Sequence, residues 1–278
     1  MKSIESISEI INNYDTFLID QWGVIHNGNI GFRNAIEALN LLKEKNKNLI
    51  IISNSSKRKA SSIDNLIKLN FNKNHFKEVL TSGELIWNKI FYQSFKELYQ
   101  KKCLHIHDQT KEDGLKFREG LDNITFIDDI EEADFVLACT PYKNSKPIDY
   151  VPLLEKAIKN KMVIYCANPD FETIDSNDNS TFCIGLICDL YKQMGGTVMI
   201  KGKPEIDIYI ESTKKIDIKK SRTIAIGDSL FHDIAGANNF NIDSALVLSG
   251  IHKNVKNIKQ FVEINKISPT YLINYFCL

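Results

Sequence analysis

Short apolar runs alternate with longer amphipathic segments along most of the chain. The runs are continuous and rich in β-branched residues, which is typical of strands buried on both faces of a parallel sheet. The expected strands are residues 16–20, 48–53, 77–82, 102–107, 133–139, 162–168, 197–202, 223–228 and 244–249. This pattern predicts an α/β protein in which strands and helices alternate.

Between these runs, apolar residues recur with helical spacing. The expected helices are residues 33–45, 57–69, 83–98, 150–159, 182–193, 204–213 and 231–238. The polar segment DSNDNST, residues 175–181, is expected to form an exposed loop. No repeat or low-complexity linker marks a domain boundary, so Gly83 and Gly195–Gly196 are the candidate hinges.

Length and charge narrow the class of protein. The 278 residues are long for one compact core and sufficient for two domains. Lys plus Arg and Asp plus Glu both number 35, so bulk charge indicates neither a nucleic-acid nor a membrane surface.

The N-terminal segment lacks the apolar core of a signal peptide. No apolar run approaches the ~18 residues of a membrane helix, and we expect a cytoplasmic protein.

The cysteines indicate the same compartment. There are six of them, without a CxxC pair, and several lie inside apolar runs such as VLACT and VIYCAN. We therefore expect buried free thiols in a reducing environment, and neither a disulfide framework nor a zinc site.

Polar side chains follow several of the expected strands. The run TFLID ends in Asp20, NLIIIS ends in Ser53, TIAIGD ends in Asp228, and Lys203 follows TVMIKG. In a parallel α/β sheet, side chains at the carboxyl ends of strands converge on one crevice. Two carboxylates, a hydroxyl and an ammonium group suit a magnesium ion and a phosphate.

Each of these signals is weak alone, because an Asp after a strand is usually a helix cap or a turn residue. Their combination and order are specific. DQWGV, beginning at Asp20, resembles the first motif of the haloacid dehalogenase (HAD) superfamily, and Ser53–Asn54 resembles the second. Lys203 in GKP resembles the third motif, and GDSLFHD, residues 227–233, resembles the fourth.

Further stretches resemble one branch of that superfamily. They are HNG after the first motif, CANPD at residues 166–170, the helix before GGTVMIKGKP, and LVLSG at residues 246–250. These are similar to the NagD-like class IIA branch, which carries a C2-type cap and includes p-nitrophenylphosphatase-like enzymes. The resemblance implies a Rossmann-like core with a parallel sheet, residues 1–82 and 195–278, and an inserted α/β cap, residues 83–194.

The resemblance also implies a mechanism. Asp20 would attack phosphorus and form an aspartyl-phosphate. Mg²⁺ would be held by Asp20, the backbone carbonyl of Trp22, and Asp228. Ser53 and Lys203 would stabilise charge on the transferring group.

Other positions receive supporting roles from the same resemblance. Asp233 would orient Lys203 or a metal-bound water, and Asn54 would shape the phosphate pocket. Gly23 and Trp22 are expected beside the phosphate or substrate, and Asn168 is a candidate to face the site. A cap over the crevice implies a small phosphorylated metabolite as substrate, and caps of this type are consistent with a homodimer.

Trp22 departs from the family pattern. HAD phosphatases normally carry there a second Asp, which protonates the leaving oxygen and then deprotonates the attacking water. An indole N–H donates a hydrogen bond but cannot transfer a proton near neutral pH, and such transfer is worth ~10²–10⁴-fold in rate. His26 is the nearest titratable replacement, and its alternative interpretation is a turn histidine bonded to the backbone.

Three outcomes stay open. The protein is a phosphatase that is slow or borrows another acid, a phospholigand-binding or regulatory protein, or a dehalogenase-like hydrolase. Dehalogenases also have an aromatic residue at this position, but they need no magnesium, whereas Asp228 and Asp233 suit a metal.

Several remaining residues have structural interpretations. Asp170 is expected as a turn or cap residue that could also face the site. His105 and His107 share one side of a strand, but no third ligand supports a metal pair. Trp87 is expected in the core or at an interface, and Tyr165 in the core.

Overall fold

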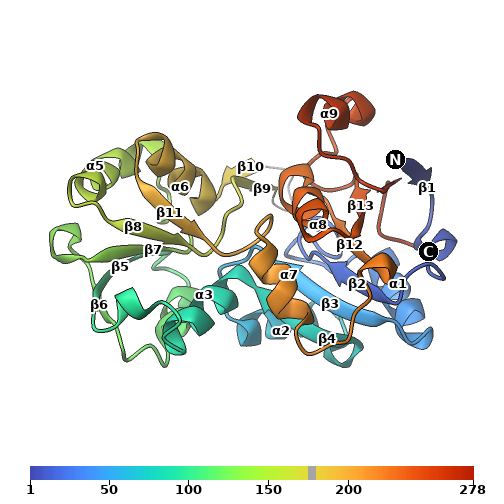
Figure 1. Cartoon of the computed structure of the whole chain (residues 1–278), viewed down its shortest axis with the longest axis horizontal. Helices are drawn as coiled ribbons and strands as arrows, with labels where there is room; N and C mark the ends of the chain where they lie inside the picture. Colours follow the sequence, from blue (N-terminus) through green and yellow to red (C-terminus); the bar gives the residue numbers. More distant parts are fainter. Residues whose placement is uncertain (175–179) are drawn as a thin grey trace.

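The computed structural model describes residues 1–174 and 180–278 and confirms the predicted α/β fold (Figure 1). It contains two α/β units joined side by side. Most of the predicted loop 175–181 lies outside the described residues. Its last two positions were predicted wrongly, because Ser180 and Thr181 begin strand β10.

The larger unit is built on a parallel sheet with the strand order β1-β14-β13-β12-β2-β3-β4. Each of its neighbouring strands pairs in parallel. The strands are β1 (Lys2–Ile4), β2 (Thr16–Ile19), β3 (Asn48–Ser53), β4 (Phe76–Thr81), β12 (Thr223–Gly227), β13 (Asp243–Val247) and β14 (Tyr271–Ile273).

Helices cover both faces of this sheet, which explains why its inner strands are apolar throughout. Phe17 and Ile19 pack with α1 (Arg33–Glu44) and α2 (Lys59–Lys68). On the opposite face, Leu18 packs with α7 (Ile206–Thr213) and α8 (Ala235–Phe240). The remaining α-helix that the structure describes in this unit is α9 (Ile258–Asn265).

The smaller unit has its own parallel sheet, ordered β11-β8-β7-β5-β6. Its strands are β5 (Lys102–Ile106), β6 (Thr125–Ile127), β7 (Phe135–Ala138), β8 (Val163–Cys166) and β11 (Thr197–Ile200). Its helices are α3 (Ser82–Phe91), α4 (Glu112–Arg118), α5 (Val151–Lys159) and α6 (Ile184–Gln193). An antiparallel hairpin of β9 (Glu172–Ile174) and β10 (Ser180–Phe182) lies between the two sheets (Figure 1).

Two details differ from the sequence prediction. The cap was predicted to end at residue 194, but β11 pairs with β8 from Thr197↔Val163 to Ile200↔Cys166. By strand pairing, the inserted segment therefore runs through Ile200. The predicted helix 83–98 ends at Phe91, because Gln93 adopts a left-handed conformation with φ of 53° that breaks the helical path.

The cysteines and the membrane prediction can be compared directly with the structure. All six cysteines lie within the described residues as free thiols, and all but Cys277 are buried. Among the described residues, no helix is both long enough and apolar enough to cross a bilayer.

Candidate active site

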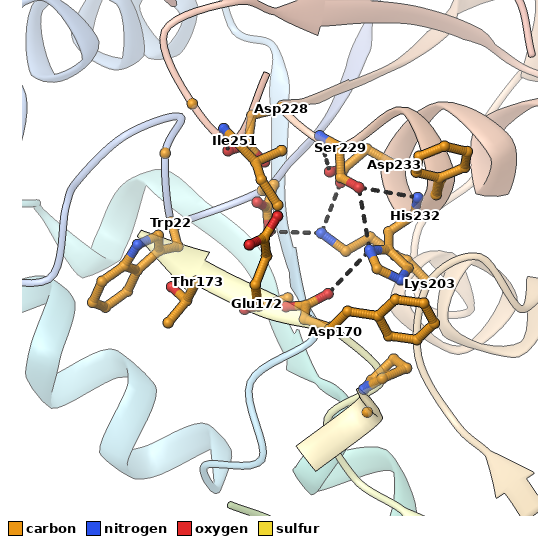
Figure 2. Close-up of a pocket in the computed structure, with 18 of the residues that line it drawn as sticks. Trp22, Asp170, Glu172, Thr173, Lys203, Asp228, Ser229, His232, Asp233 and Ile251 are labelled. Atoms are coloured by element: carbon orange, nitrogen blue, oxygen red, sulfur yellow. Dashed lines mark hydrogen bonds and ion pairs between the residues drawn. The ribbon is translucent and has the colours of Figure 1, made fainter. Parts of the chain in front are cut away.

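The sheet topology brings the predicted site residues together. Asp20, Ser53 and Asp228 stand at the carboxyl ends of β2, β3 and β12, which are neighbours in the larger sheet. Lys203 and Asp233 reach the same point from the segments after β11 and β12. All five side chains are buried and line one cavity of about 770 Å³ (Figure 2).

A buried ion network forms the centre of the site. The ammonium of Lys203 lies 2.6 Å from Asp20 Oδ1 and 2.7 Å from Asp233 Oδ1. Burial opposes the charged form, but the two carboxylates raise the pKa of Lys203 above its ordinary value, so the side chain stays cationic. The other oxygen of Asp233 accepts a hydrogen bond from the backbone N–H of Ser229 at 3.1 Å. Both oxygens of Asp233 are therefore engaged, in the Lys203-orienting geometry that the sequence predicted.

The carboxylates also fit a divalent cation. Ligand atoms of Asp20, Asp228 and Asp233 all lie within 4.8 Å of one another. Burial raises the pKa of Asp20 to about 7, and it also raises the pKa of Asp228. The positive charge that the protein places around these two carboxylates therefore does not fully offset the cost of burying their negative charge. Hard oxygen donors of this kind suit Mg²⁺ or Ca²⁺. Since Asp233 is engaged elsewhere, Asp20 and Asp228 are the side chains available to a metal.

Two glycines allow the chain to approach Asp228 closely. A Cβ on Gly23, which has φ of +78°, would stand 2.1 Å from Asp228 Oδ2, and one on Gly250 would stand 1.9 Å from it. The same oxygen accepts a hydrogen bond from the backbone N–H of Ile251 at 2.9 Å. Backbone packed this tightly fixes the position of the Asp228 carboxylate, and Gly23 lies in the cavity wall where it was expected.

Trp22 lines the cavity but turns its ring onto its own loop. A Cβ on Gly28 would meet the indole at 2.2 Å, and the ring of His26 lies 5.7 Å away in an edge-on arrangement. In Figure 2, the indole of Trp22 and the ring of His232 lie on opposite sides of the cluster of site carboxylates. The acid that the family pattern places here is absent.

His26 is unsuited to replace that acid. Its side chain is buried and does not belong to the cavity wall. Its Nδ1 accepts a hydrogen bond from the backbone N–H of Gly28 at 3.1 Å, and burial lowers its pKa to about 4. The structure therefore favours the backbone-bonded turn histidine over a proton donor.

The side chains of Asn54 and Asn168 form hydrogen bonds with other residues of the site. Asn54 Oδ1 accepts a hydrogen bond from the backbone N–H of Lys203 at 2.7 Å, and its Nδ2 donates to Asp170 Oδ1 at 2.7 Å. Asn168 Oδ1 accepts from the backbone N–H of Asp170 at 3.1 Å. Neither asparagine is in the cavity wall, whereas Asp170 is. The expected substrate contact of Asn168 is thus replaced by a role in shaping the loop that carries Asp170.

Sequence reasoning missed part of the cavity wall. His232, Glu172 and His252 line it together with Asp170, and His232 Nδ1 lies 3.2 Å from Asp170 Oδ1. His232 stands inside the fourth motif, beside Asp233, so its position was a usable signal. The hairpin that carries Glu172 offered none, because its strands are only three residues long.

His105, in β5, and His107, just after that strand, are unsuited to a metal ion. Arg118 donates to His105 Nδ1 at 3.1 Å and lies 3.2 Å from His107 Nε2. A guanidinium cannot be deprotonated in a protein, so it repels a metal cation at these ring nitrogens. Trp87 and Tyr165 are buried in the same unit, as expected.

Comparisons with known proteins cover most of the chain. A family model described as haloacid dehalogenase-like hydrolase matches residues 17–117. A second, described as HAD-hydrolase-like, matches residues 200–277. Together they contain each of the buried ion-network residues. No curated protein matches the chain by sequence.

Solved structures resemble both units together. A hydrolase of the haloacid dehalogenase-like family from Brucella suis has 27% identity and a TM-score of 0.83, covering 98% of this chain and 99% of its own. A possible sugar phosphatase of the HAD superfamily from Cytophaga hutchinsonii has 19% identity and a TM-score of 0.84, with 100% and 99% covered. A p-nitrophenyl phosphatase from Archaeoglobus fulgidus has 19% identity and a TM-score of 0.71, with 95% and 97% covered.

Proposed function

The chain belongs to the haloacid dehalogenase-like hydrolases, and on that premise we propose that it is a Mg²⁺-dependent phosphatase that works through an aspartyl-phosphate on Asp20. One observation carries this proposal: the buried ammonium of Lys203 contacts Asp20 and Asp233 beside Asp228, at the base of a cavity. A nucleophile, a cation for the phosphoryl oxygens and a metal-binding carboxylate are thus within one cluster.

Each residue has a defined role in this reaction. Asp20 attacks phosphorus, and Lys203 and Ser53 stabilise the negative charge of the transferring group. Asp233 holds Lys203 in place, and Asn54 fixes the backbone of Lys203. Asp20, Asp228 and the backbone carbonyl of Trp22 would hold the metal. When bound, Mg²⁺ neutralises charge on the carboxylates and on the phosphate.

The cavity supports a small phosphorylated metabolite as the substrate. Its volume of about 770 Å³ is within the range of small-molecule sites. Its walls come from both units, including Phe231 of the larger unit and Lys192 and Ile200 of the smaller one. A possible sugar phosphatase and a p-nitrophenyl phosphatase share this fold, which supports the same substrate class here. The homodimer that the resemblance implies stays a prediction.

Trp22 keeps one alternative open, a protein that binds a phospholigand and turns it over slowly or not at all. The dehalogenase alternative receives less support, since Asp20, Asp228 and Asp233 form a cluster suited to a cation.

The test is phosphate release from p-nitrophenyl phosphate by wild type and Asp20→Asn, with and without Mg²⁺. We expect Mg²⁺-dependent release by wild type that Asp20→Asn abolishes. Release by both variants at the same rate, or by neither, would contradict the proposed reaction. Thermal stabilisation of wild type by phosphate esters without any turnover would support the binding alternative.

A further inference from the structure

Hydrolysis of an ester with a poor leaving group requires a proton donor that position 22 cannot supply. Lys203 and Asp233 are engaged with each other, and His26 lies outside the cavity wall. His252 Nε2 accepts a hydrogen bond from the backbone N–H of Leu230 at 3.0 Å, so it is engaged as well. The titratable groups left in the cavity wall near the carboxylates are Asp170, His232 and Glu172.

Asp170 is held from two sides by residues next to the catalytic ones. Its Oδ1 accepts from Asn54 Nδ2 at 2.7 Å and lies 3.2 Å from His232 Nδ1. Asn54 directly follows Ser53, and His232 directly precedes Asp233. Within the described residues, Asp170 Oδ2 makes no hydrogen bond. The carboxyl group is thus fixed by one oxygen, and the other is available to a substrate.

Asp170 also lies near the nucleophile. Asp170, Asp20 and Lys203 line the wall of the same cavity. Figure 2 shows Asp170 and His232 beside the end of Lys203, on the side of the cavity opposite Trp22. The residue belongs to the loop after β8, so this carboxyl group comes from the cap and lies over the core site.

We propose that Asp170 is the general acid and base of this enzyme, with His232 as the positioning residue that orients it, in place of the acid absent at position 22. This inference rests on the proposed phosphatase function. It assigns to a cap residue the proton transfer that the first motif cannot perform.

The proton balance is simple. In this proposal Asp170 and His232, joined by the 3.2 Å contact, enter the reaction as a pair that carries one proton. As Asp20 attacks, the bond from phosphorus to the leaving oxygen breaks, and Asp170 gives its proton to that oxygen, which departs as an alcohol. In the second step Asp170 takes a proton from water, the water oxygen bonds to phosphorus, and the bond to Asp20 breaks. The products are an alcohol and inorganic phosphate, and the pair has regained its proton.

Glu172 is the competing candidate and supplies a matched control. It lies two residues away, on β9, and also lines the cavity. It is exposed, and its Oε2 accepts a hydrogen bond from Ser180 Oγ at 2.6 Å. Within the described residues, no hydrogen bond or ion pair joins its side chain to Asn54 or to the fourth motif. Asp170→Asn and Glu172→Gln make the same chemical change at neighbouring positions.

The experiment compares leaving groups. The value of kcat/KM is measured for two substrates. The leaving group of p-nitrophenyl phosphate departs with little protonation, whereas the leaving oxygen of glycerol phosphate must be protonated as it departs. We expect Asp170→Asn to change the first value by a few-fold and to lower the second by ~10²–10⁴-fold. Because water activation is also impaired, Asp170→Asn should release a burst of p-nitrophenol equal to the enzyme concentration. For Glu172→Gln we expect the same relative effect on both substrates, and no burst.

His232 is tested through the ratio of kcat/KM for glycerol phosphate to kcat/KM for p-nitrophenyl phosphate. Asn can place an N–H near the position of Nδ1, so His232→Asn should preserve the preference for glycerol phosphate better than His232→Leu does. A residue that only supports folding would lower both rates together.

The outcomes separate this inference from the proposed function. An equal loss on both substrates in Asp170→Asn, or a selective loss in Glu172→Gln instead, overturns the assignment of Asp170 while Asp20→Asn still abolishes activity. Should Asp170→Asn fail to fold, the two His232 variants decide, and an equal effect of both on the two substrates overturns it.

Discussion

The ammonium of Lys203 lies 2.6 Å from Asp20 Oδ1 in a site where the lysine side chain is 2% exposed. This contact joins residues 183 positions apart in the sequence and ties the segment after the cap to the first strand of the site. In the proposed reaction this buried cation stabilises the transferring group, and its removal would also leave two acids without their partner. It therefore affects stability and activity together.

We expect Lys203→Met to lower the free energy of unfolding by ~3–5 kcal/mol, the usual cost of removing one partner of a buried pair. Phosphate release should be lost as well. Lys201→Met is the matched control, because Lys201 pairs with the partly exposed Asp207. That change should cost at most about 1 kcal/mol. Urea denaturation of both variants measures the difference, and equal losses would contradict the importance of the buried pair.

A second prediction concerns Gly250. Its substitution by Ala would place a Cβ 1.9 Å from Asp228 Oδ2, and no backbone strain is added because this glycine does not have a positive φ. The carboxylate must therefore move, and we expect at least a tenfold weaker affinity for Mg²⁺, which corresponds to ~1.4 kcal/mol. Calorimetric titration with Mg²⁺ measures this. Gly195→Ala is the control for Mg²⁺ affinity: its φ of +94° strains the backbone of an alanine, but the new Cβ meets nothing within 4 Å, so Mg²⁺ should bind as it does to wild type.

The location of these residues could be predicted from sequence, and the reasons are physical. Short continuous apolar runs rich in β-branched residues are typical of strands covered on both faces, and side chains after neighbouring parallel strands converge at one edge of the sheet. Asp20, Ser53 and Asp228 are brought together by that rule alone. The same rule was applied to Lys203, but there it does not hold, because Lys203 follows β11, a strand of the other sheet.

Other features depend on tertiary contacts that no local pattern encodes. The run TVMIKG would read the same in either sheet, and only pairing with β8 assigns β11 to the smaller unit. The contact of Asn54 with Asp170 spans 116 positions and depends on how the two units sit together. The ring of Trp22 turns onto Gly28, whose lack of a side chain makes the space. That arrangement was not predictable from the residue types.

The buried histidine beside Trp22 predicts a pH dependence of stability. The pKa of His26 is lowered from 6.5 to about 4 by burial. Between these values the unfolded chain binds a proton that the folded chain does not, so stability is full above pH 6.5 and declines as the pH falls toward 4. The contribution is on the order of 3 kcal/mol.

The check is urea denaturation at pH 7 and pH 5 for wild type and His26→Asn. Asn retains an acceptor for the N–H of Gly28 and does not titrate in this range. Wild type should lose more stability than His26→Asn between the two pH values. Burial also lowers the pKa values of His105 and His107, so both proteins should retain some slope. Identical slopes would show that His26 does not carry the effect.

The last prediction concerns position 22 itself. If Asp170 performs the proton transfer, Trp22→Asp adds a second acid near Asp20, and the two should be redundant. We therefore expect Trp22→Asp to restore the glycerol phosphate activity of Asp170→Asn by at least tenfold, while it changes the same activity much less in the wild-type background. Trp22→Asn is the control, because it removes the same indole from Gly28 without adding a titratable group. Measurement of kcat/KM in wild type, the two single variants and the double variant gives the coupling between the sites. Equal gains from Trp22→Asp in both backgrounds would mean that the two positions act independently, and that Asp170 has another role.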